Sequence, residues 1–485
     1  MGFVPWLFVK DNRCTMNIDD LYKDEEEFRD SISTVDEKGK RIWIYPKKPF
    51  GIFHKRRVIL SIFLVAFLFL APHIKINGEP IILLNIIDRK FVFFGQVFWP
   101  QDLYIFAFTT ILIVVFIILF TVVFGRIFCG WVCPQTIFME MVFRKIEYWI
   151  EGDWTHQKRL NQQTWNTEKI FKKTAKHVIF ILISFAIAHT FLAYIIGADA
   201  LWEIQTSPLE NHLGGFIAMV IFTGLFYGVF SFLREQVCTT ICPYGRLQGV
   251  LLDKNSIVVA YDHVRGEQRA KFRKNEDRSA EGKGDCIDCN QCVHVCPTGI
   301  DIRNGTQLEC VNCTACIDAC DHVMDSIGKP KGLIRYASEN NIEGGKKFQW
   351  NPRTIAYTAL LGLLLVIWGL LIGTRSNFDA TIIKQRGTTY QKLDNGLLSN
   401  IYEINLTNKT KESFQISIAL DGVEGEISLA KPNLELGPEE RVKERFVVKL
   451  HPSELQRGQR RFHIIVYGDG KPILRKKTSF VGPLL

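Results

Sequence analysis

The hydrophobic and polar positions of the chain separate into long apolar blocks, short alternating stretches and polar connections. Five of the apolar blocks are about as long as a helix that crosses a bilayer core of roughly 30 Å. These blocks are 58–76, 103–124, 178–197, 213–233 and 354–373. The first is interrupted near its end by Pro72, His73 and Lys75. The pattern predicts a five-span α-helical membrane domain.

Shorter apolar segments lie beside these blocks. Ile81–Ile87 and Phe91–Trp99 are too short to cross, so we expect them at the outer membrane interface. From Pro134 onward, apolar residues recur at helical spacing, which predicts an amphipathic helix along the inner membrane surface. Its apolar side would consist of Ile137, Phe138, Met141, Val142, Ile146, Trp149 and Ile150.

Beyond the last block, apolar and polar residues alternate with the period of β-strands. Ile401–Leu406, Phe414–Leu420 and Phe462–Tyr467 are three such stretches, and Gly, Asn and Asp turn residues separate them. Several short strands in one segment favour a small β-sandwich over residues 375–485.

The basic residues predict the orientation in the membrane. Lys55, Arg56 and Arg57 precede the first block, and Lys and Arg are frequent between the second and third blocks, whereas 198–212 contains neither. The positive-inside rule then places the N-terminus and the segment Arg234–Arg353 in the cytoplasm, and five spans place the C-terminal domain outside. The net charge of +9 is accordingly a signal of topology and lipid contact, and no motif for nucleic-acid binding accompanies it.

Twelve of the thirteen cysteines fall into four groups. Two groups have the Cys-x2-Cys-x2-Cys-x3-Cys spacing of a ferredoxin with two [4Fe–4S] clusters, in which the last cysteine of each run binds the other cluster. The predicted ligand sets are Cys286, Cys289, Cys292 and Cys320 for one cluster, and Cys310, Cys313, Cys316 and Cys296 for the second. Zinc sites also use Cys-x2-Cys pairs, but two runs of this length favour clusters. Asp321 stands where the first run has Pro297.

The other two groups are Cys129-x3-Cys133-Pro134 and Cys238-x3-Cys242-Pro243, and each follows an apolar block. Cysteines at i and i+4 lie on one face of a helix, so each pair is able to offer two thiolates to one ion. If the second and fourth spans pack together, all four sulfurs would converge, and soft thiolates bind Cu(I), zinc or an Fe–S cluster. The alternative is that they are small apolar residues at a helix interface. We call these four residues the membrane-edge cysteines.

We do not expect the remaining cysteine, methionine and histidine side chains to bind metal. No cysteine follows Cys320, as suits a C-terminal domain in an oxidising compartment. Cys14 is expected to be a free cytoplasmic thiol. We expect core packing for the methionines, and surface or cluster-tuning roles for the two histidines of the ferredoxin segment, rather than copper binding. These residues are Met139, Met141, Met324, His294 and His322.

The residues around these motifs resemble the FixG/CcoG/RdxA family of cytochrome oxidase accessory proteins. The resemblance is carried by Gly125–Thr136, by Cys238–Gln248, and by the order of dicluster run, last span and β-rich tail. It covers the chain from about Lys40 onward. It implies an immunoglobulin-like fold for the tail, residence in the bacterial inner membrane, and a role in assembly of cbb-type oxidase by reduction of Cu(II) to Cu(I).

The resemblance also implies partners and roles. The ferredoxin clusters would deliver electrons, and the membrane-edge cysteines would be the catalytic site, where copper or an additional cluster is bound. Expected partners are membrane lipid, a copper-transporting P-type ATPase, a copper chaperone, the oxidase assembly machinery, an electron donor that the sequence does not identify, and further copies of the chain. The expected domains are 1–57 as a cytoplasmic tail, 58–253 as four spans, 254–350 as the ferredoxin, 354–373 as the fifth span and 375–485 as the periplasmic sandwich.

Two other functions stay open from the sequence. The protein would be a quinol-linked membrane electron relay, similar to NapH-type ferredoxins, if the membrane domain oxidises quinol. It would be a non-catalytic assembly scaffold if its clusters are structural. Reduction of Cu(II), the function implied by the resemblance, would make the protein an oxidoreductase, specifically a cupric reductase.

Overall fold

The computed structural model describes residues 34, 38, 40–76, 78–87, 89–99, 102–273, 276–278, 280–345, 350–385, 389–394, 396–431 and 434–483. Cys14 and the acidic residues near the N-terminus lie outside this part of the chain. The chain forms two compact units, of which the first contains all the clustered cysteines and the second contains the C-terminal sheets.

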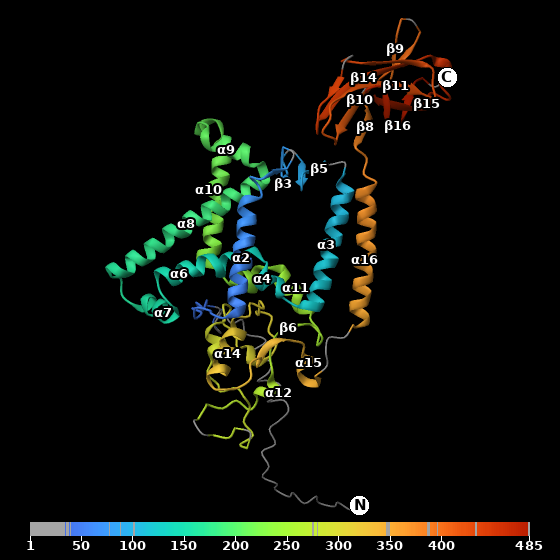
Figure 1. Ribbon diagram of the computed structural model, residues 1–485. Helices are drawn as coiled ribbons and strands as arrows, with labels where there is room; N and C mark the ends of the chain where they lie inside the picture. Colours follow the sequence, from blue (N-terminus) through green and yellow to red (C-terminus); the bar gives the residue numbers. More distant parts are fainter. Residues whose placement is uncertain are drawn as a thin grey trace, which may run out of the picture. The chain divides into compact units, whose positions relative to one another are not determined.

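Among the described residues, four helices are long and apolar enough to cross a membrane (Figure 1). They are α3 (Leu103–Phe124), α8 (Thr167–Ile196), α10 (Leu213–Gly228) with its π-helical end Val229–Leu233, and α16 (Pro352–Gly373). The indole Nε1 of Trp368 on α16 donates to Thr109 Oγ1 on α3 at 2.9 Å, and the two helices lie side by side in both ribbon views. These helices indicate a membrane protein.

The first expected span is a helix that begins and ends six residues earlier, and is more polar, than the sequence predicts. Helix α2 covers Ile52–Leu70, so the expected end at residue 76 is wrong. Pro72 cannot continue a helix, and Lys75–Ile76 forms β1, which pairs with β2 (Glu79–Pro80). Basic residues in its first two turns lower the mean hydropathy of α2, and it is not one of the four candidate spans.

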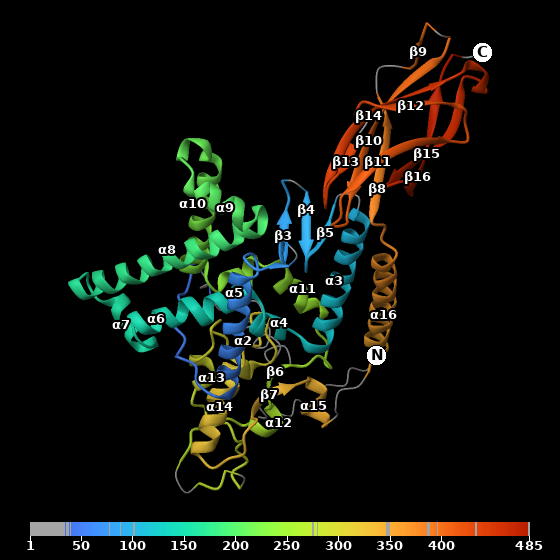
Figure 2. The same ribbon diagram turned by 45° about the horizontal axis from the view of Figure 1, so that its top comes forward.

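The short aromatic segments after α2 form a sheet. β3 (Ile82–Asn85), β4 (Lys90–Phe93) and β5 (Gln96–Phe98) are antiparallel neighbours in this order (Figure 2). Val92 and Val97 are buried between Leu83 and Trp99. The strands satisfy their own backbone groups by pairing, which a single segment lying at an interface would not do.

The helix predicted from Pro134 exists, but its apolar side faces protein. It consists of α5 (Pro134–Ile137), a π-helical turn over Phe138–Phe143 and α6 (Arg144–Ile150). Phe143 is fully buried and stacks on Phe230 at a ring distance of 4.4 Å. Trp149, by contrast, is 80% exposed. The π-turn rotates the helix face, so the residues buried by the core differ from those at regular helical spacing.

The ferredoxin segment begins and ends with a strand, and the two strands pair as an antiparallel sheet. β6 (Val258–Tyr261) precedes the cysteine runs and pairs with β7 (Ile334–Ala337), which follows them. Between the strands lie α13 (Gln291–His294) and α14 (Ala315–Ser326), which contain later cysteines of the first and the second run. The remaining helices of this unit are α4 (Ile127–Trp131), α7 (Trp154–Gln162), α9 (Ala198–Thr206), α11 (Pro243–Leu251), α12 (His263–Gly266) and α15 (Glu339–Gly344).

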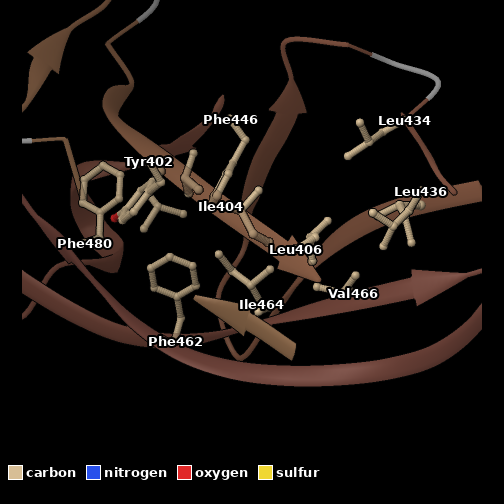
Figure 3. Packing of buried hydrophobic residues seen from close by; sticks show 14 of the residues in the cluster. Tyr402, Ile404, Leu406, Leu434, Leu436, Phe446, Phe462, Ile464, Val466 and Phe480 are labelled. Carbon is tan, nitrogen blue, oxygen red and sulfur yellow. The ribbon is translucent and has the colours of Figure 1, made fainter. Parts of the chain in front are cut away.

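The C-terminal segment is a β-sandwich, as the alternation predicts. One sheet has the order β12-β14-β10-β8 with β9 beside β10, and the other has the order β13-β11-β15-β16. The strands are β8 (Phe378–Lys384), β9 (Gln391–Lys392), β10 (Leu398–Asn408), β11 (Phe414–Asp421), β12 (Gly425–Leu429), β13 (Leu434–Leu436), β14 (Arg441–Leu450), β15 (Gln459–Gly468) and β16 (Lys471–Val481). Alternate residues of both sheets fill the core, where Tyr402 stacks on Phe446 (Figure 3).

Candidate functional site

Each ferredoxin run folds around its middle cysteine in the same way. Asp288 and Asn290 on either side of Cys289 have φ of 51° and 55°, and the equivalent Asn312 and Thr314 around Cys313 have φ of 53° and 66°. Asp and Asn tolerate this left-handed conformation, whereas Thr rarely adopts it. The two loops therefore curl alike, and the strain at Thr314 is held by the surrounding fold.

The first cavity of the ferredoxin segment is lined by one complete predicted ligand set. Cys286, Cys289 and Cys292 come from the first run and Cys320 comes from α14 of the second run. Apolar side chains, including Met324 and Leu333, line much of the rest of this cavity, and the polar side chains include Arg303. A set of four sulfurs around one cavity fits a [4Fe–4S] cluster.

The second cavity contains the other ligand set. Its walls include Cys296 from the first run and Cys310, Cys313 and Cys316 from the second. Cys292 lines both cavities, so the two sites are direct neighbours. The exchange of the fourth cysteine between runs, expected from the spacing, is the arrangement that the fold produces.

Several of these thiols are too deeply buried to serve as free nucleophiles, whereas Cys289 is exposed. Burial, followed by the neighbouring Cys296 and Cys313, raises the pKa of Cys310 to about 12, and burial raises the pKa of Cys313 to about 11. Burial also raises the pKa of Cys292 to about 12. A thiolate in such a place needs bound positive charge, which iron supplies.

Within the described residues, no three His, Cys, Asp or Glu side chains are close enough together to hold a single metal ion. Four thiolates around one zinc ion would lie about 3.8 Å apart, because each Zn–S bond is about 2.3 Å. The described cysteines do not form a single-ion site of this kind. A cube whose corner irons each take one thiolate is the larger group that a set of four cysteines suits.

The two Cys-x3-Cys-Pro motifs share a local structure that differs from the expected single helical face. Cys129 lies in the short helix α4, and Cys238 lies in a π-helical turn over Val237–Ile241. Cys133 and Cys242 are in extended conformation at the N-caps of α5 and α11. The cause is the proline after each second cysteine, which disfavours helix at the preceding residue and then opens a new helix.

Cys238 lies close to two of the other membrane-edge cysteines. The electrostatic neighbours that affect Cys238 include Cys133 and Cys129. Burial, followed by Cys133, raises the pKa of Cys238 to about 12, and burial also raises the pKa of Cys129. The Cys129 thiol lies 3.5 Å from Oε1 of the fully buried Gln248, and Thr136 Oγ1 lies 4.0 Å from the Cys238 sulfur. Cys242, four residues further along, is half-buried.

The membrane-edge cysteines pack directly against the second ferredoxin cavity. Cys129 and Cys238 belong to one packed cluster with Cys313 and Cys316. Gly130 makes the approach possible, since a Cβ there would lie 2.6 Å from the carbonyl oxygens of both Val311 and Asn312. The four cysteine groups therefore form one continuous series, from the first cavity through the second to the membrane edge.

Two buried arginines at this junction were not predicted as site residues. Arg57 of α2 donates from Nε to the Gly130 carbonyl and from Nη1 to the Cys313 carbonyl, both at 2.9 Å. Arg126 immediately precedes α4 and is only 4% exposed. From the sequence, Arg57 is only one of the basic residues that predict the topology. For Arg126, the signal in the sequence is its position three residues before Cys129.

The other soft residues have packing roles. Met139 and Met324 are buried in apolar clusters, and Met141 is 8% exposed. His294 stacks on Trp154 at 4.9 Å, and His322 lies edge-on to Phe50 at 5.1 Å.

Three family models match the chain. A 4Fe-4S dicluster domain matches residues 233–339, which include all ten cysteines from Cys238 to Cys320. A 4Fe-4S binding domain matches residues 106–156, which include Cys129 and Cys133. A model described as the IG-like fold at the C-terminal of FixG matches residues 368–483.

Relatives match over most of their length. Protein RdxB of Cereibacter sphaeroides is 36% identical over 78% of this chain and 82% of its own. Nitrogen fixation protein FixG of Rhizobium meliloti is 32% identical over 79% of this chain and 80% of its own. The chain belongs to the FixG/RdxA/RdxB family. Protein RdxA of Cereibacter sphaeroides is 35% identical over 79% of this FixG-family chain and 83% of its own.

Membership confirms several predictions from the sequence. This FixG-family protein has ferredoxin-type 4Fe-4S domains and two [4Fe–4S] clusters, and its β-sandwich is the immunoglobulin-like FixG domain. It is an iron–sulfur protein of electron transfer with apolar helices suited to a membrane.

Proposed function

We propose that this FixG-family protein conducts electrons along its four cysteine groups and reduces Cu(II) to Cu(I) at the membrane-edge cysteines. The observation that carries the proposal is the packing of Cys129 and Cys238 against Cys313 and Cys316. A thiol site placed in contact with an electron carrier is well placed to receive its electrons. A 4Fe-4S family model matches residues 106–156, so we propose an additional cluster as the alternative to copper at the membrane-edge cysteines.

The proposed ligands follow the two cavities. Cys286, Cys289, Cys292 and Cys320 hold the first cluster, and Cys296, Cys310, Cys313 and Cys316 hold the second. Each cluster, when bound, accepts and releases one electron at a time. The chain itself holds the clusters in adjacent apolar cavities, and places the second against the membrane-edge cysteines.

Copper suits this end of the series chemically. Cu(II) needs one electron to become Cu(I), and Cu(I) is a soft ion that thiolates bind well. Cys129, Cys133, Cys238 and Cys242 offer such ligands, with Gln248 and Thr136 beside the sulfurs. On this proposal the enzyme class is cupric reductase, and its product passes to a copper chaperone, a copper-transporting ATPase and the assembly machinery of cbb-type oxidase.

The location and topology belong to the same proposal. We place α2 as a fifth, tilted crossing of the bacterial inner membrane, with Lys55, Arg56 and Arg57 on the cytoplasmic side. The ferredoxin then lies in the cytoplasm and the immunoglobulin-like domain in the periplasm, separated by α16.

Cu(I) formation tests the proposal. Anaerobically purified protein, reduced with dithionite and freed of excess reductant, is mixed with Cu(II), and Cu(I) is measured with a specific chelator. Two reduced clusters should yield about two Cu(I) per chain, one for each electron that leaves them. Oxidised clusters with no Cu(I) formed would refute the proposal.

The same preparation distinguishes the alternatives. Reduction of the clusters by a quinol analogue, with no reaction toward Cu(II), would identify a quinol-linked relay. Oxidase assembly that persists in cells after all eight ferredoxin cysteines are replaced by Ser would identify a scaffold. Iron analysis defines the membrane-edge occupant, since about eight iron atoms mean two clusters and about twelve mean a third.

A further inference from the structure

Arg126 occupies a buried position between two groups of cysteines. Its side chain is only 4% exposed, and Nη1 donates to the carbonyl oxygen of Leu308 in the ferredoxin segment. Its Nη2 lies 2.8 Å from the place of a Cβ on Gly245, beside the Cys238 carbonyl. The guanidinium thus reaches from the first Cys-x3-Cys-Pro motif to the second and to the ferredoxin.

Arg126 differs from Arg144 and Arg234, which pair with acidic side chains, and resembles Arg57, which donates to backbone carbonyls. Arg144 lies 2.6 Å from Glu140, and Arg234 forms two bonds of 2.9 and 2.7 Å with Glu147. In the described part of the chain, no Asp or Glu oxygen lies within 4.0 Å of the Arg126 guanidinium, and its Nε has no hydrogen-bond partner. A guanidinium stays charged at any physiological pH, and burying it without an anion costs several kcal/mol.

The anions available to Arg126 are sulfurs. It lines a small cavity together with Cys310, and it acts electrostatically on Cys129, Cys238 and Cys310, lowering the pKa of each against the larger effect of burial. Cys129 and Cys238 belong to the membrane edge, whereas Cys310 belongs to the second ferredoxin cavity. The Arg126 charge therefore faces both ends of the last step in the series, and Arg57 adds a second charge beside Cys313.

We propose that Arg126 directs electron transfer through its buried charge. This charge raises the reduction potential of the groups held by the second cavity and by the membrane-edge cysteines. An added electron makes those groups more negative, so a nearby buried cation stabilises the reduced state. The first cavity lies on the far side of the second, so electrons entering there move toward Arg126. This inference rests on the electron-transfer part of the proposed function and not on copper.

The test is a potentiometric titration of the purified full-length protein, followed by electron paramagnetic resonance. Arg126→Gln removes the charge while keeping length and polarity, and Arg126→Lys keeps the charge. The matched control is Arg246→Gln, which removes the same charge from an exposed position of α11. The cluster of the first cavity, followed in the same titration, is the internal reference.

In Arg126→Gln, the equilibrium constant for reducing the nearer group should fall about tenfold or more, which corresponds to a potential lower by about 59 mV for one electron. The far cluster, Arg126→Lys and Arg246→Gln should titrate like the parent. Unchanged potentials in Arg126→Gln, or equal shifts of both clusters, would overturn the inference.

If Arg126→Gln loses its iron, its potentials cannot be measured, and Arg126→Lys becomes the deciding variant. A lysine variant with full iron loading and a parental potential supports the role of charge, because packing at this site is altered in both variants. Loss of iron from both variants would mean that Arg126 acts through packing alone, which overturns the inference. Neither result depends on copper reduction, so failure here is distinguishable from failure of the proposed reaction.

Discussion

At the scale of single residues, the spacing of the cysteines predicts the cluster ligands well. It does not predict the contact between the membrane-edge cysteines and the second cavity. The ligand exchange between Cys296 and Cys320 follows from the ferredoxin pattern. Gly130 and Arg126 gain their meaning from loops about 180 residues later in the chain, whose position a local pattern does not contain. A single glycine beside Cys129 has no signal of its own.

Gly130→Ala is expected to separate the membrane-edge cysteines from the second cavity. Its Cβ would meet backbone oxygens of Val311 and Asn312 at 2.6 Å, and backbone yields less readily than side chains. Overpacking of this kind costs about 1 to 3 kcal/mol. We expect a lower unfolding temperature and a slower transfer of electrons to any acceptor at the membrane edge.

Gly224→Ala is the matched control for this substitution. Gly224 is in α10, where a Cβ would have no neighbour within 4 Å, so alanine should stabilise the helix by about 0.5 to 1 kcal/mol. Equal unfolding temperatures and transfer rates for Gly130→Ala and the parent would show that the two cysteine loops do not touch as described.

At the scale of elements, apolar periodicity found the helices and strands but not their interruptions. The strands around Tyr402 and Phe462 were predicted because their alternation matches a two-layer core. The Cys-x3-Cys-Pro segments were predicted as one helical face and are instead two elements each, because proline restricts its predecessor. The end of α2 was missed for a related reason, since apolar residues continue beyond Pro72.

A buried ion pair fixes the turn before Cys238 to the helix after Cys133. Arg234 binds both oxygens of Glu147, and Lys176 lies 3.6 Å from that carboxylate. Burial alone would raise the pKa of Glu147, but Arg234 and Lys176 hold it below its usual value. The pair therefore positions one Cys-x3-Cys-Pro motif against the other.

Arg234→Met should destabilise the fold by about 3 to 5 kcal/mol, because it leaves the buried Glu147 carboxylate with too little positive charge. Thermal unfolding and iron content would record the loss. Lys172→Met removes an exposed ion pair with Glu168 on α8, so its unfolding temperature should stay close to that of the parent. Similar losses from the two variants would contradict a special role for the buried pair.

At the scale of the whole molecule, the order of domains was evident from the sequence, whereas the ties within the second unit were not. Asp102, which is 1% exposed, accepts hydrogen bonds from Lys409 at 2.6 Å and from Arg375 at 2.7 Å. It precedes α3, Arg375 follows α16 and Lys409 follows β10. Three distant segments are joined by one carboxylate that no sequence motif marks.

Asp102→Asn should loosen the β-sandwich from the chain around α3 and α16, at a cost of about 3 to 5 kcal/mol. Limited proteolysis around Arg375 and the unfolding temperature report this directly. Asp379→Asn, which removes a more exposed pair with Lys476, is the control. Unaltered proteolysis of Asp102→Asn would exclude the carboxylate as the tie.

The same carboxylate predicts a pH dependence. Burial alone would raise the pKa of Asp102, but hydrogen bonds and charge from Lys409 and Arg375 lower it below the usual value of about 3.9. Its stabilising contribution is then complete above about pH 5 and is lost as the pH falls through the lowered pKa. Unfolding measured from pH 8 to pH 3 should show a parental advantage over Asp102→Asn that disappears only at the acidic end.

On the proposed function, electrons leave the protein through the membrane-edge cysteines. Rapid mixing of the dithionite-reduced protein with Cu(II), followed by cluster absorbance, compares the parent with a variant in which Cys129, Cys133, Cys238 and Cys242 are all Ala. The variant should keep the eight ferredoxin cysteines and their iron, and its clusters should reoxidise at least about 100-fold more slowly, as expected when about 2.7 kcal/mol is added to the barrier. Equal reoxidation rates in the two proteins would contradict the account.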